Sequence, residues 1–298
     1  MHEQLRVYTV ALAAEVKARA YWMFITHGLR LRWEGARHLD PVKRHIASGG
    51  SLVAISNHES IIDPGVVISL LQKALRGLIG TKIWLASSKF FPHLYDSLDH
   101  ASTIAFTREI AMHRQEAMED EARSMGAIAA ANRVQMLPIV QSHRMREGKF
   151  KRLNVNINLA SFDLLSATLR EDRTVAGICP EGTRSLDGTL GEAQAGIQHV
   201  FRDKEVSDKT MILPLGLVGT RDIHRVDDGW RNPLAPVCAV FGPAFFYYDI
   251  RQDADTFHLL PKDLLMLRVA RLLPSDKLGY YNQKQFLQYL SKEDNPTG

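Results

Sequence analysis

Hydrophobic and polar positions divide the chain into short apolar runs and longer amphipathic stretches. The apolar runs have the length of strands and lie at residues 52–56, 78–86, 134–140, 174–179, 211–217 and 237–241. Stretches with apolar residues at helical spacing separate them, at 63–76, 109–131, 159–169 and 264–273. Continuous apolar runs are typical of strands that are buried on both faces of a parallel sheet. The pattern therefore predicts an α/β fold with a central, mostly parallel sheet and helices on both faces.

The N-terminal residues have a different pattern. Residues 3 to about 30 carry apolar side chains at helical spacing, with an aromatic stretch at 21–25 and Lys17, Arg19, Arg30 and Arg32 beside it. Aromatic and basic side chains together suit a helix that lies in the interface of a lipid bilayer. The same spacing also fits an amphipathic helix packed on the protein core, so both interpretations stay open.

The domain organisation follows from these patterns. We expect residues 1–32 to form an N-terminal amphipathic helical segment at a membrane surface, and residues 33–298 to form one domain. No internal repeat and no low-complexity linker divides that second part. A length of 298 residues with 45% hydrophobic residues is sufficient for such an α/β unit.

Composition limits the partners and the compartment. The formal net charge of +4 permits attraction to anionic lipid or phosphate, and fits a mildly basic globular protein equally well. Two cysteines provide neither a disulfide framework nor metal-ligand spacing, so we expect a reducing compartment and no metal. No segment has the roughly 18–20 apolar residues of a membrane-spanning helix. Charged residues interrupt any N-terminal signal sequence, and we expect no nucleic-acid partner.

The first chemical motif follows the apolar run 52–56 and reads Asn-His-Glu-Ser-Ile-Ile-Asp at residues 57–63. A histidine is the usual general base for an alcohol, and a carboxylate can orient its other ring nitrogen. His58 and Asp63 are five positions apart, close enough to pair if the intervening residues turn into a helix. A Gly-x-Ser-x-Gly elbow is absent, so the base is expected to activate a hydroxyl of the substrate.

The second motif follows the apolar run 174–179 and reads Pro-Glu-Gly-Thr-Arg-Ser at residues 180–185. Gly182 permits close approach of a ligand to the backbone, Thr183 supplies a hydroxyl, and Arg184 offers a planar fork for a phosphate. The alternative interpretation is a β-turn with a surface arginine. Pro180 and Gly182 would end the strand at the edge where open α/β sheets bind ligands.

These two motifs resemble the glycerophospholipid acyltransferase family, whose bacterial example is a 1-acyl-glycerol-3-phosphate acyltransferase. The family's block Asn-His-x-Ser-x-x-Asp is matched at Asn57, His58, Ser60 and Asp63, and its block Pro-Glu-Gly-Thr-Arg-Ser is matched throughout residues 180–185. An apolar run with a proline at 212–215 resembles a further block. The resemblance spans roughly residues 50–220.

The chain departs from the family at the block that ends in an arginine. Arg144, at the end of residues 138–144, is the better candidate for that arginine, and Arg108 is the weaker one. Choosing Arg144 implies that the helix at about 109–131 is an insertion. Lys89 is a further candidate phosphate ligand, and a surface lysine is the alternative.

The resemblance implies a reaction and its partners. His58, oriented by Asp63, would take the proton from a lipid hydroxyl that attacks an acyl thioester. Glu181, Gly182, Thr183, Arg184, Arg144 and Lys89 would bind the substrate. The acyl donor would be acyl-CoA or an acyl-carrier protein, with no further cofactor. The acceptor would be a lysophosphatidate-like glycerolipid, at the cytoplasmic face of a membrane.

Three alternatives remain at the level of the sequence. The acceptor can be another hydroxyl lipid, such as a lysophospholipid or a glycolipid. The protein can be a non-catalytic lipid-binding protein, although such a protein needs neither His58 nor Asp63. It can also be a hydrolase of the thioester, which the missing nucleophile disfavours. The sequence leaves the acyl chain length and the oligomeric state open.

Overall fold

The computed structural model describes residues 23–87, 134–140, 151–225 and 229–291. The strands of its main sheet are β1 (Arg30–Glu34), β2 (Ser51–Ser56), β3 (Lys82–Ser87), β4 (Val134–Ile139), β5 (Val175–Ile178), β6 (Thr210–Val218), β9 (Pro236–Phe241) and β10 (Phe245–Phe246). They lie in the order β1-β9-β6-β2-β5-β3-β4, and β10 pairs with β6. A separate hairpin consists of β7 (His224–Arg225) and β8 (Gly229–Trp230).

The five strands from β6 to β4 run parallel to one another, whereas β9 and β10 are antiparallel to β6. β1 then pairs in parallel with β9. The expected mostly parallel sheet is thus confirmed. Pro214, in the middle of β6, has no N–H group to donate. It falls between the residues of β6 that pair with β10 and those that pair with β9, so the sheet tolerates it.

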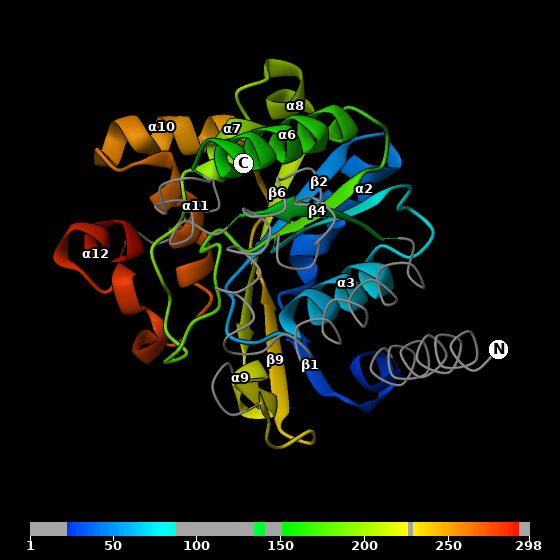
Figure 1. The fold of residues 1–298 in the computed structure, drawn as a ribbon, viewed down its shortest axis with the longest axis vertical. Coiled ribbons are helices and arrows are strands. Elements are labelled where there is room, and N and C mark those ends of the chain that lie inside the picture. Colours follow the sequence, from blue (N-terminus) through cyan, green and yellow to red (C-terminus); the bar gives the residue numbers. More distant parts are fainter. Residues whose placement is uncertain (1–22, 88–133, 141–150, 226–228, 292–298) are drawn as a thin grey trace, which may run out of the picture.

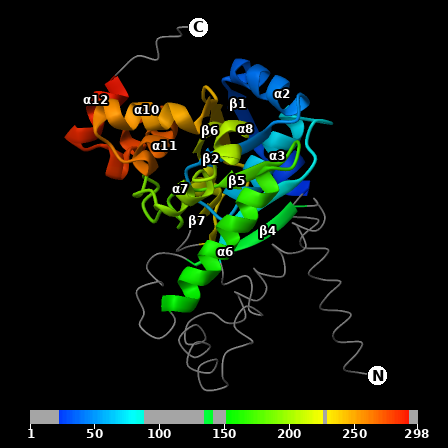
Figure 2. The same ribbon diagram turned by 90° about the horizontal axis from the view of Figure 1, so that it is seen from above.

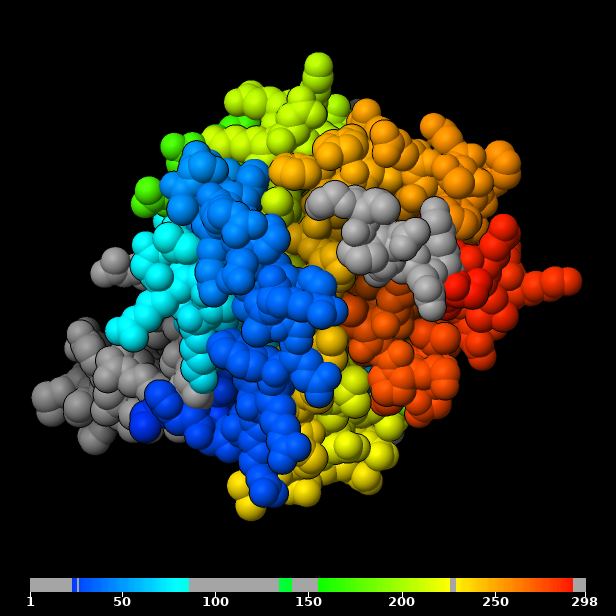
Figure 3. Space-filling view, turned by 180° about the vertical axis from the view of Figure 1, so that it is seen from behind, coloured from blue at the N-terminus to red at the C-terminus, as the bar shows by residue number. Residues whose placement is uncertain are grey.

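Helices cover both faces of this sheet, as expected. They are η1 (Phe24–Gly28), η2 (Ala36–His38), α2 (Leu39–Ala47), α3 (Asp63–Ala74), α6 (Lys151–Leu169), α7 (Gly196–Val200), α8 (Lys204–Lys209), α9 (Thr220–Ile223), α10 (Tyr247–Phe257), α11 (Pro261–Ala270), η6 (Ser275–Lys277), η7 (Gly279–Tyr281) and α12 (Lys284–Ser291). Figure 2 shows α10, α11 and α12 on one side of the strands and α2 and α3 on the other. Seen from behind, the N-terminal residues from β1 to α2 form a continuous band beside the C-terminal helices (Figure 3).

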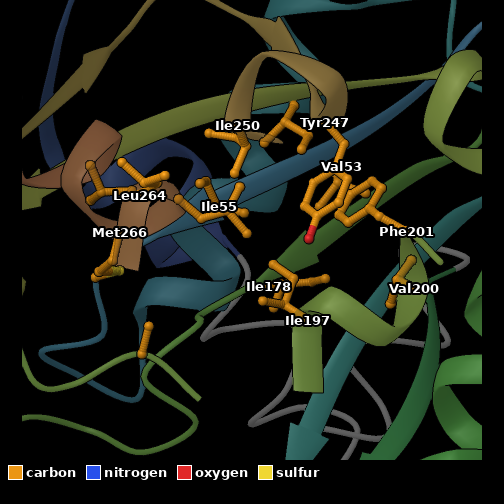
Figure 4. Packing of buried hydrophobic residues seen from close by; sticks show 14 of the residues in the cluster. Val53, Ile55, Ile178, Ile197, Val200, Phe201, Tyr247, Ile250, Leu264 and Met266 are labelled. Carbon is orange, nitrogen blue, oxygen red and sulfur yellow. The ribbon is translucent and has the colours of Figure 1, made fainter. Parts of the chain in front are cut away.

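The alternation of side chains along β2 explains the two layers. Val53 and Ile55 point to the core beneath α6, α7, α10 and α11, while Leu52 and Ala54 point to the core beneath α2 and α3. All six residues of β2 are buried, which is why the strand reads as a continuous apolar run. In the first core, the rings of Phe201 and Tyr247 stack with centroids 4.7 Å apart (Figure 4).

The N-terminal expectation needs a correction at its boundary. Residues 30–32 were expected to end a helical segment, but Arg30–Glu34 form the edge strand β1. Just before it, Ile25 is buried in the second core, and the Phe24 ring contacts the Trp230 ring with centroids 5.8 Å apart. Packing on the core is therefore the correct interpretation for these two residues. The rest of the expected N-terminal helix, and the expected insertion at 109–131, lie outside the described residues.

Over the part of the chain that the structure describes, no helix has the length and apolar character needed to span a bilayer.

Candidate active site

The two motifs meet because their strands are neighbours in the sheet. β2 and β5 run in parallel, with Ile55 in register with Ile178, so both strands end at the same edge. The loop 57–62 leaves β2 there, and the loop that begins at Cys179 leaves β5 beside it. Two backbone-directed hydrogen bonds join the loops: the His58 N–H donates to Glu181 Oε1 (2.8 Å) and the Ser185 N–H donates to the His58 carbonyl (2.7 Å).

His58 and Asp63 form the expected pair. His58 Nδ1 lies 3.0 Å from Asp63 Oδ2, and the side chain of Asp63 is fully buried whereas that of His58 is 18% exposed. Because Nδ1 is held by the carboxylate, Nε2 is the ring nitrogen that can accept a proton from a bound molecule. This is the arrangement of a general base with an orienting carboxylate.

The carboxylate of Asp63 is itself held in place by the loop. Oδ2 also accepts the backbone N–H groups of Glu59 and Ser60, each at 2.7 Å. Asp63 is the first residue of α3 and Pro64 follows it, so the acid lies at a helix N-terminus, where a negative charge is stabilised. The loop and the helix start therefore fix the position of the acid before any substrate binds.

The Glu181 side chain holds the loop after β5 against the His58 loop through two hydrogen bonds. Its side chain is buried, Oε1 accepts the His58 N–H, and Oε2 accepts the Gly191 N–H at 2.8 Å. Burial raises the pKa of Glu181 to about 8, although the two N–H groups oppose this shift. Both carboxylate oxygens are thus occupied within the protein. Glu181 positions the two loops, and its expected contact with a substrate stays a prediction.

In the rest of the Pro-Glu-Gly-Thr-Arg-Ser turn, some residues have hydrogen-bond partners within the described part of the protein and others do not. Gly182 has φ 69°, in the left-handed region that glycine adopts without strain. The Ser185 hydroxyl donates to Asp187 Oδ1 (3.0 Å) and accepts the Gly188 N–H (2.9 Å). Among the described residues, Thr183 and Arg184 make no hydrogen bond or ion pair through either backbone N–H or side chain. They are the residues of the turn that remain available to a ligand.

Asn57 connects the His58 loop to the other neighbouring strand. Its side-chain amide donates to the Leu217 carbonyl (2.8 Å), and its side-chain oxygen accepts the Leu217 N–H (2.7 Å). Ser60 adds a hydrogen bond from its hydroxyl to the His224 carbonyl (2.9 Å). Asn57 and Ser60 therefore fix the His58 loop to the end of β6 and to β7.

A narrow recess, of about 150 Å³ including space that is open to solvent, lies beside His58, and we call it the His58 recess. Its lining includes Asn57, His58, Glu59, Glu181, Thr189 and Lys277. Lys277 comes from the C-terminal η6, and its Nζ lies 3.3 Å from Glu59 Oε1. Burial, and to a smaller extent the charge of Asp63, raises the pKa of Glu59 to about 7, while Lys277 opposes that shift. Sequence reasoning missed Lys277 because its contact with the motif is made only by the tertiary fold.

Arg144 and Lys89 lie outside the described residues, so their positions relative to His58 stay predictions. Where the structure describes the chain, no group of three or more His, Cys, Asp and Glu side chains could hold a metal ion. The pKa of the Cys179 thiol is raised well above its ordinary value, mainly by burial and also by the charge of Asp63. That shift disfavours the thiolate that a nucleophilic cysteine needs.

Comparison with known proteins bears on this arrangement. No curated protein matches the chain. The sequence model of the family described as Acyltransferase matches residues 37–218, which include both motifs and the strands β2, β5 and β6 that position them. This match extends over more than half of the 298 residues, and the chain therefore belongs to the acyltransferase family.

Proposed function

We propose that the protein transfers a fatty acyl group from a thioester, acyl-CoA or an acyl-carrier protein, to a hydroxyl group of a lysophosphatidate-like glycerolipid. The observation that carries the proposal is the His58–Asp63 pair, 3.0 Å apart at the end of β2, with the Glu181 loop hydrogen-bonded beside it. Among the described residues, no hydroxyl or thiol is hydrogen-bonded to the His58 ring, and such a general base suits direct attack by a substrate hydroxyl.

The reaction then proceeds in two proton transfers. His58 Nε2 takes the proton of the acceptor hydroxyl as its oxygen attacks the thioester carbonyl, and Asp63 stabilises the resulting imidazolium. The tetrahedral intermediate collapses by breaking the carbon–sulfur bond. The departing thiolate takes the proton back from His58, which leaves an oxygen ester and a free thiol.

Backbone amides are the expected donors to the oxyanion of this intermediate. The amides of His58, Glu59, Ser60, Gly182 and Ser185 already donate within the protein. The amides of Thr183 and Arg184 do not, as far as the described residues extend, and we assign the oxyanion to them. The guanidinium group of Arg184 would then hold the phosphate of the acceptor, with Arg144 and Lys89 as further candidate ligands.

The acceptor and the product of this reaction are lipids, so we further propose that the protein works as a peripheral protein on the cytoplasmic face of a membrane. The support comes from the sequence, where Lys17 and Arg19 precede the aromatic stretch at 21–25. Basic residues near an anionic bilayer contribute about 1 kcal/mol each. Met23, in the middle of that stretch and the first residue that the structure describes, is exposed.

The experiment is a screen of acceptors with one acyl-CoA, read out as release of free thiol and as formation of the acylated lipid. Lysophosphatidate, glycerol 3-phosphate, lysophosphatidylcholine and a lysoglycolipid are each supplied with oleoyl-CoA. We expect acceptor-dependent thiol release that is fastest with lysophosphatidate. Thiol release that does not depend on any acceptor would instead indicate a hydrolase, and no release would leave a lipid-binding protein as the better description.

A further inference from the structure

Lys277 belongs to the His58 recess although it lies far beyond the residues that match the family. The match ends at residue 218, whereas Lys277 is the last residue of η6. Its side chain is 23% exposed and lines the recess together with His58, Glu59 and Thr189. A cation from outside the family region therefore stands at the same recess as the proposed base.

The backbone around Lys277 is fixed to the loop that follows the Glu181 motif. The Leu190 N–H donates to the Lys277 carbonyl (2.9 Å), and the Tyr280 N–H donates to the Leu190 carbonyl (2.9 Å). The Tyr281 hydroxyl accepts the Ala193 N–H at 3.0 Å, in the same loop. Figure 1 shows this loop, after β5, running beside the C-terminal segment between α11 and α12. Lys277 is thus held at the recess by structure and does not reach it by chance as a flexible surface side chain.

Gly188 provides the space that the ammonium group needs. A Cβ atom at this position would lie 3.1 Å from Lys277 Nζ and 2.8 Å from Arg221 Cδ, and Gly188 has φ 83°. A glycine here lets two cationic side chains approach the loop that follows the turn, where the Arg221 guanidinium also donates to the Leu186 carbonyl. The positive charge of Lys277 therefore lies beside Gly188, three residues after the end of the Pro-Glu-Gly-Thr-Arg-Ser turn.

The ammonium group of Lys277 has hydrogen-bonding capacity to spare. Its partner in the described residues is Glu59 Oε1 at 3.3 Å, and an ammonium group has three N–H donors. Glu59 is almost fully buried, and its other oxygen, Oε2, has no hydrogen-bond partner among the described residues. The raised pKa of Glu59, about 7, means that the acid is partly neutral near neutral pH. A neutral Glu59 leaves the charge of Lys277 uncompensated in the recess.

We propose that Lys277 is a specificity-determining residue whose ammonium group binds the phosphate ester of the acceptor at the solvent-exposed opening of the His58 recess. The proposal rests on the proposed acyl transfer to a phosphate-bearing glycerolipid, and it names a ligand for that phosphate on the C-terminal segment. Arg184 and Lys277 then approach the acceptor from the β5 loop and from η6, and the acceptor hydroxyl faces His58. Lys277 therefore does not contribute to the affinity for an acceptor that lacks a phosphate.

The test compares full-length Lys277→Ala, Lys277→Arg and the wild type with two acceptors, 1-oleoyl-lysophosphatidate and 1-oleoylglycerol, which differ by the phosphate alone. We expect Lys277→Ala to raise KM for lysophosphatidate about ten- to a hundredfold, the equivalent of one lost charge-assisted hydrogen bond. The KM for oleoylglycerol and kcat for both should change less than threefold, and Lys277→Arg should recover most of the loss. Lys284→Ala, an exposed lysine on α12, is the matched control.

A second variant separates phosphate binding from simple neutralisation of Glu59. If Lys277 only compensates that buried acid, the double variant Glu59→Gln/Lys277→Ala recovers a normal KM for lysophosphatidate. If Lys277 binds the phosphate, the double variant keeps the raised KM. Equal KM changes for the two acceptors, or recovery in the double variant, would overturn the proposal.

A binding measurement makes this result independent of turnover. Calorimetric titration with glycerol 3-phosphate, and separately with inorganic phosphate, should show at least tenfold weaker binding of glycerol 3-phosphate to Lys277→Ala than to the wild type. If the wild type binds inorganic phosphate but not glycerol 3-phosphate, Lys277 binds free phosphate and the acceptor assignment is overturned. Equal binding of glycerol 3-phosphate by the wild type and Lys277→Ala would overturn it as well. A wild type that binds glycerol 3-phosphate through Lys277 but transfers no acyl group would refute the proposed function and leave the phosphate site standing.

Discussion

Glu181 Oε1 accepts the backbone N–H of His58 at 2.8 Å, across 123 positions of the chain. The other oxygen, Oε2, accepts the Gly191 N–H. A carboxylate is able to serve both donors because both of its oxygens are acceptors, which an amide cannot match. This one side chain makes the position of the proposed base depend on the Pro-Glu-Gly-Thr-Arg-Ser turn.

Glu181→Ala should therefore lower both stability and turnover. Two N–H groups would lose their acceptor, and a buried unsatisfied donor costs about 1–3 kcal/mol. We expect urea unfolding to show a loss in that range and kcat to fall at least tenfold. Glu181→Gln should be intermediate, because one oxygen remains. Glu171→Ala, which changes an exposed acid two residues after the end of α6, serves as the control. Wild-type stability and turnover in Glu181→Ala would show that Glu181 does not hold the two loops in position.

The proposed base is tested by His58→Ala and Asp63→Asn in the full-length protein. Loss of general-base catalysis typically lowers the rate about a hundred- to ten-thousandfold. We expect kcat for acyl transfer to fall by that factor in His58→Ala, with a melting temperature close to wild type because the ring is partly exposed. Asp63→Asn should also lose transfer, since it removes the charge that supports an imidazolium. His27→Ala is an exposed control, and near-normal turnover in His58→Ala would rule out His58 as the base.

Arg184→Ala should mainly raise KM for a phosphate-bearing acceptor. Arg184 has no partner among the described residues, so its removal leaves no internal group unpaired, and a phosphate is present throughout the reaction. The expected increase is about ten- to a hundredfold, from a charge-assisted hydrogen bond of about 1.5–3 kcal/mol. Arg44→Ala on the exposed face of α2 is the control. An unchanged KM would show that the acceptor is held without Arg184.

The strands and the two motifs could be predicted from sequence because buried parallel strands read as apolar runs and the motifs directly follow two of them. The neighbouring positions of β2 and β5 then place His58, Asp63 and the Glu181 turn together. The edge strand β1 could not be found in this way, since Arg30, Arg32 and Glu34 interrupt any apolar pattern. At an exposed edge, pairing with β9 determines the structure and burial contributes little.

The internal role of Glu181 and the presence of Lys277 were equally hidden. An acid in a strand-end turn looks the same in sequence whether it faces a substrate or two backbone amides. Lys277 stands in a short 3-10 turn with no local chemical pattern, and its relation to Glu59 arises from the packing of the C-terminal segment against the loop around Leu190. Contacts between distant segments carry no signal in a single sequence.

The N-terminal residues should attach the protein to anionic membranes. Vesicle flotation of the full chain and of a shortened chain tests this. The structure determines where the chain should be shortened, because Ile25 is buried and β1 begins at Arg30. A deletion of residues 1–22 keeps those contacts, whereas a chain starting at Leu31 would lose them. We expect the full chain to float with vesicles that contain phosphatidylglycerol and the shortened chain to remain in the lower fraction. Equal flotation of both, or of neither, would contradict the interfacial role.

The pH dependence of stability should reveal Glu59. In the unfolded chain this acid loses its proton near the ordinary pKa of 4.5, and in the folded protein the pKa is raised to about 7. Between these values the folded state binds more protons than the unfolded state, so the free energy of unfolding falls as the pH rises. The stabilisation is complete below about pH 4.5 and is lost as the pH passes 7. The difference of about 2.5 pH units corresponds to roughly 3 kcal/mol.

Glu59→Gln removes this titration. Urea unfolding at several pH values from 5 to 8 should give a curve that is flatter for Glu59→Gln than for the wild type, with the variant the more stable of the two at pH 8. Glu171→Gln, which changes an exposed acid, should follow the wild type. Parallel curves for Glu59→Gln and the wild type would show that Glu59 titrates normally in the folded protein. In that case Lys277 would remain paired with a charged carboxylate near neutral pH, and its ammonium group would be less available to a phosphate.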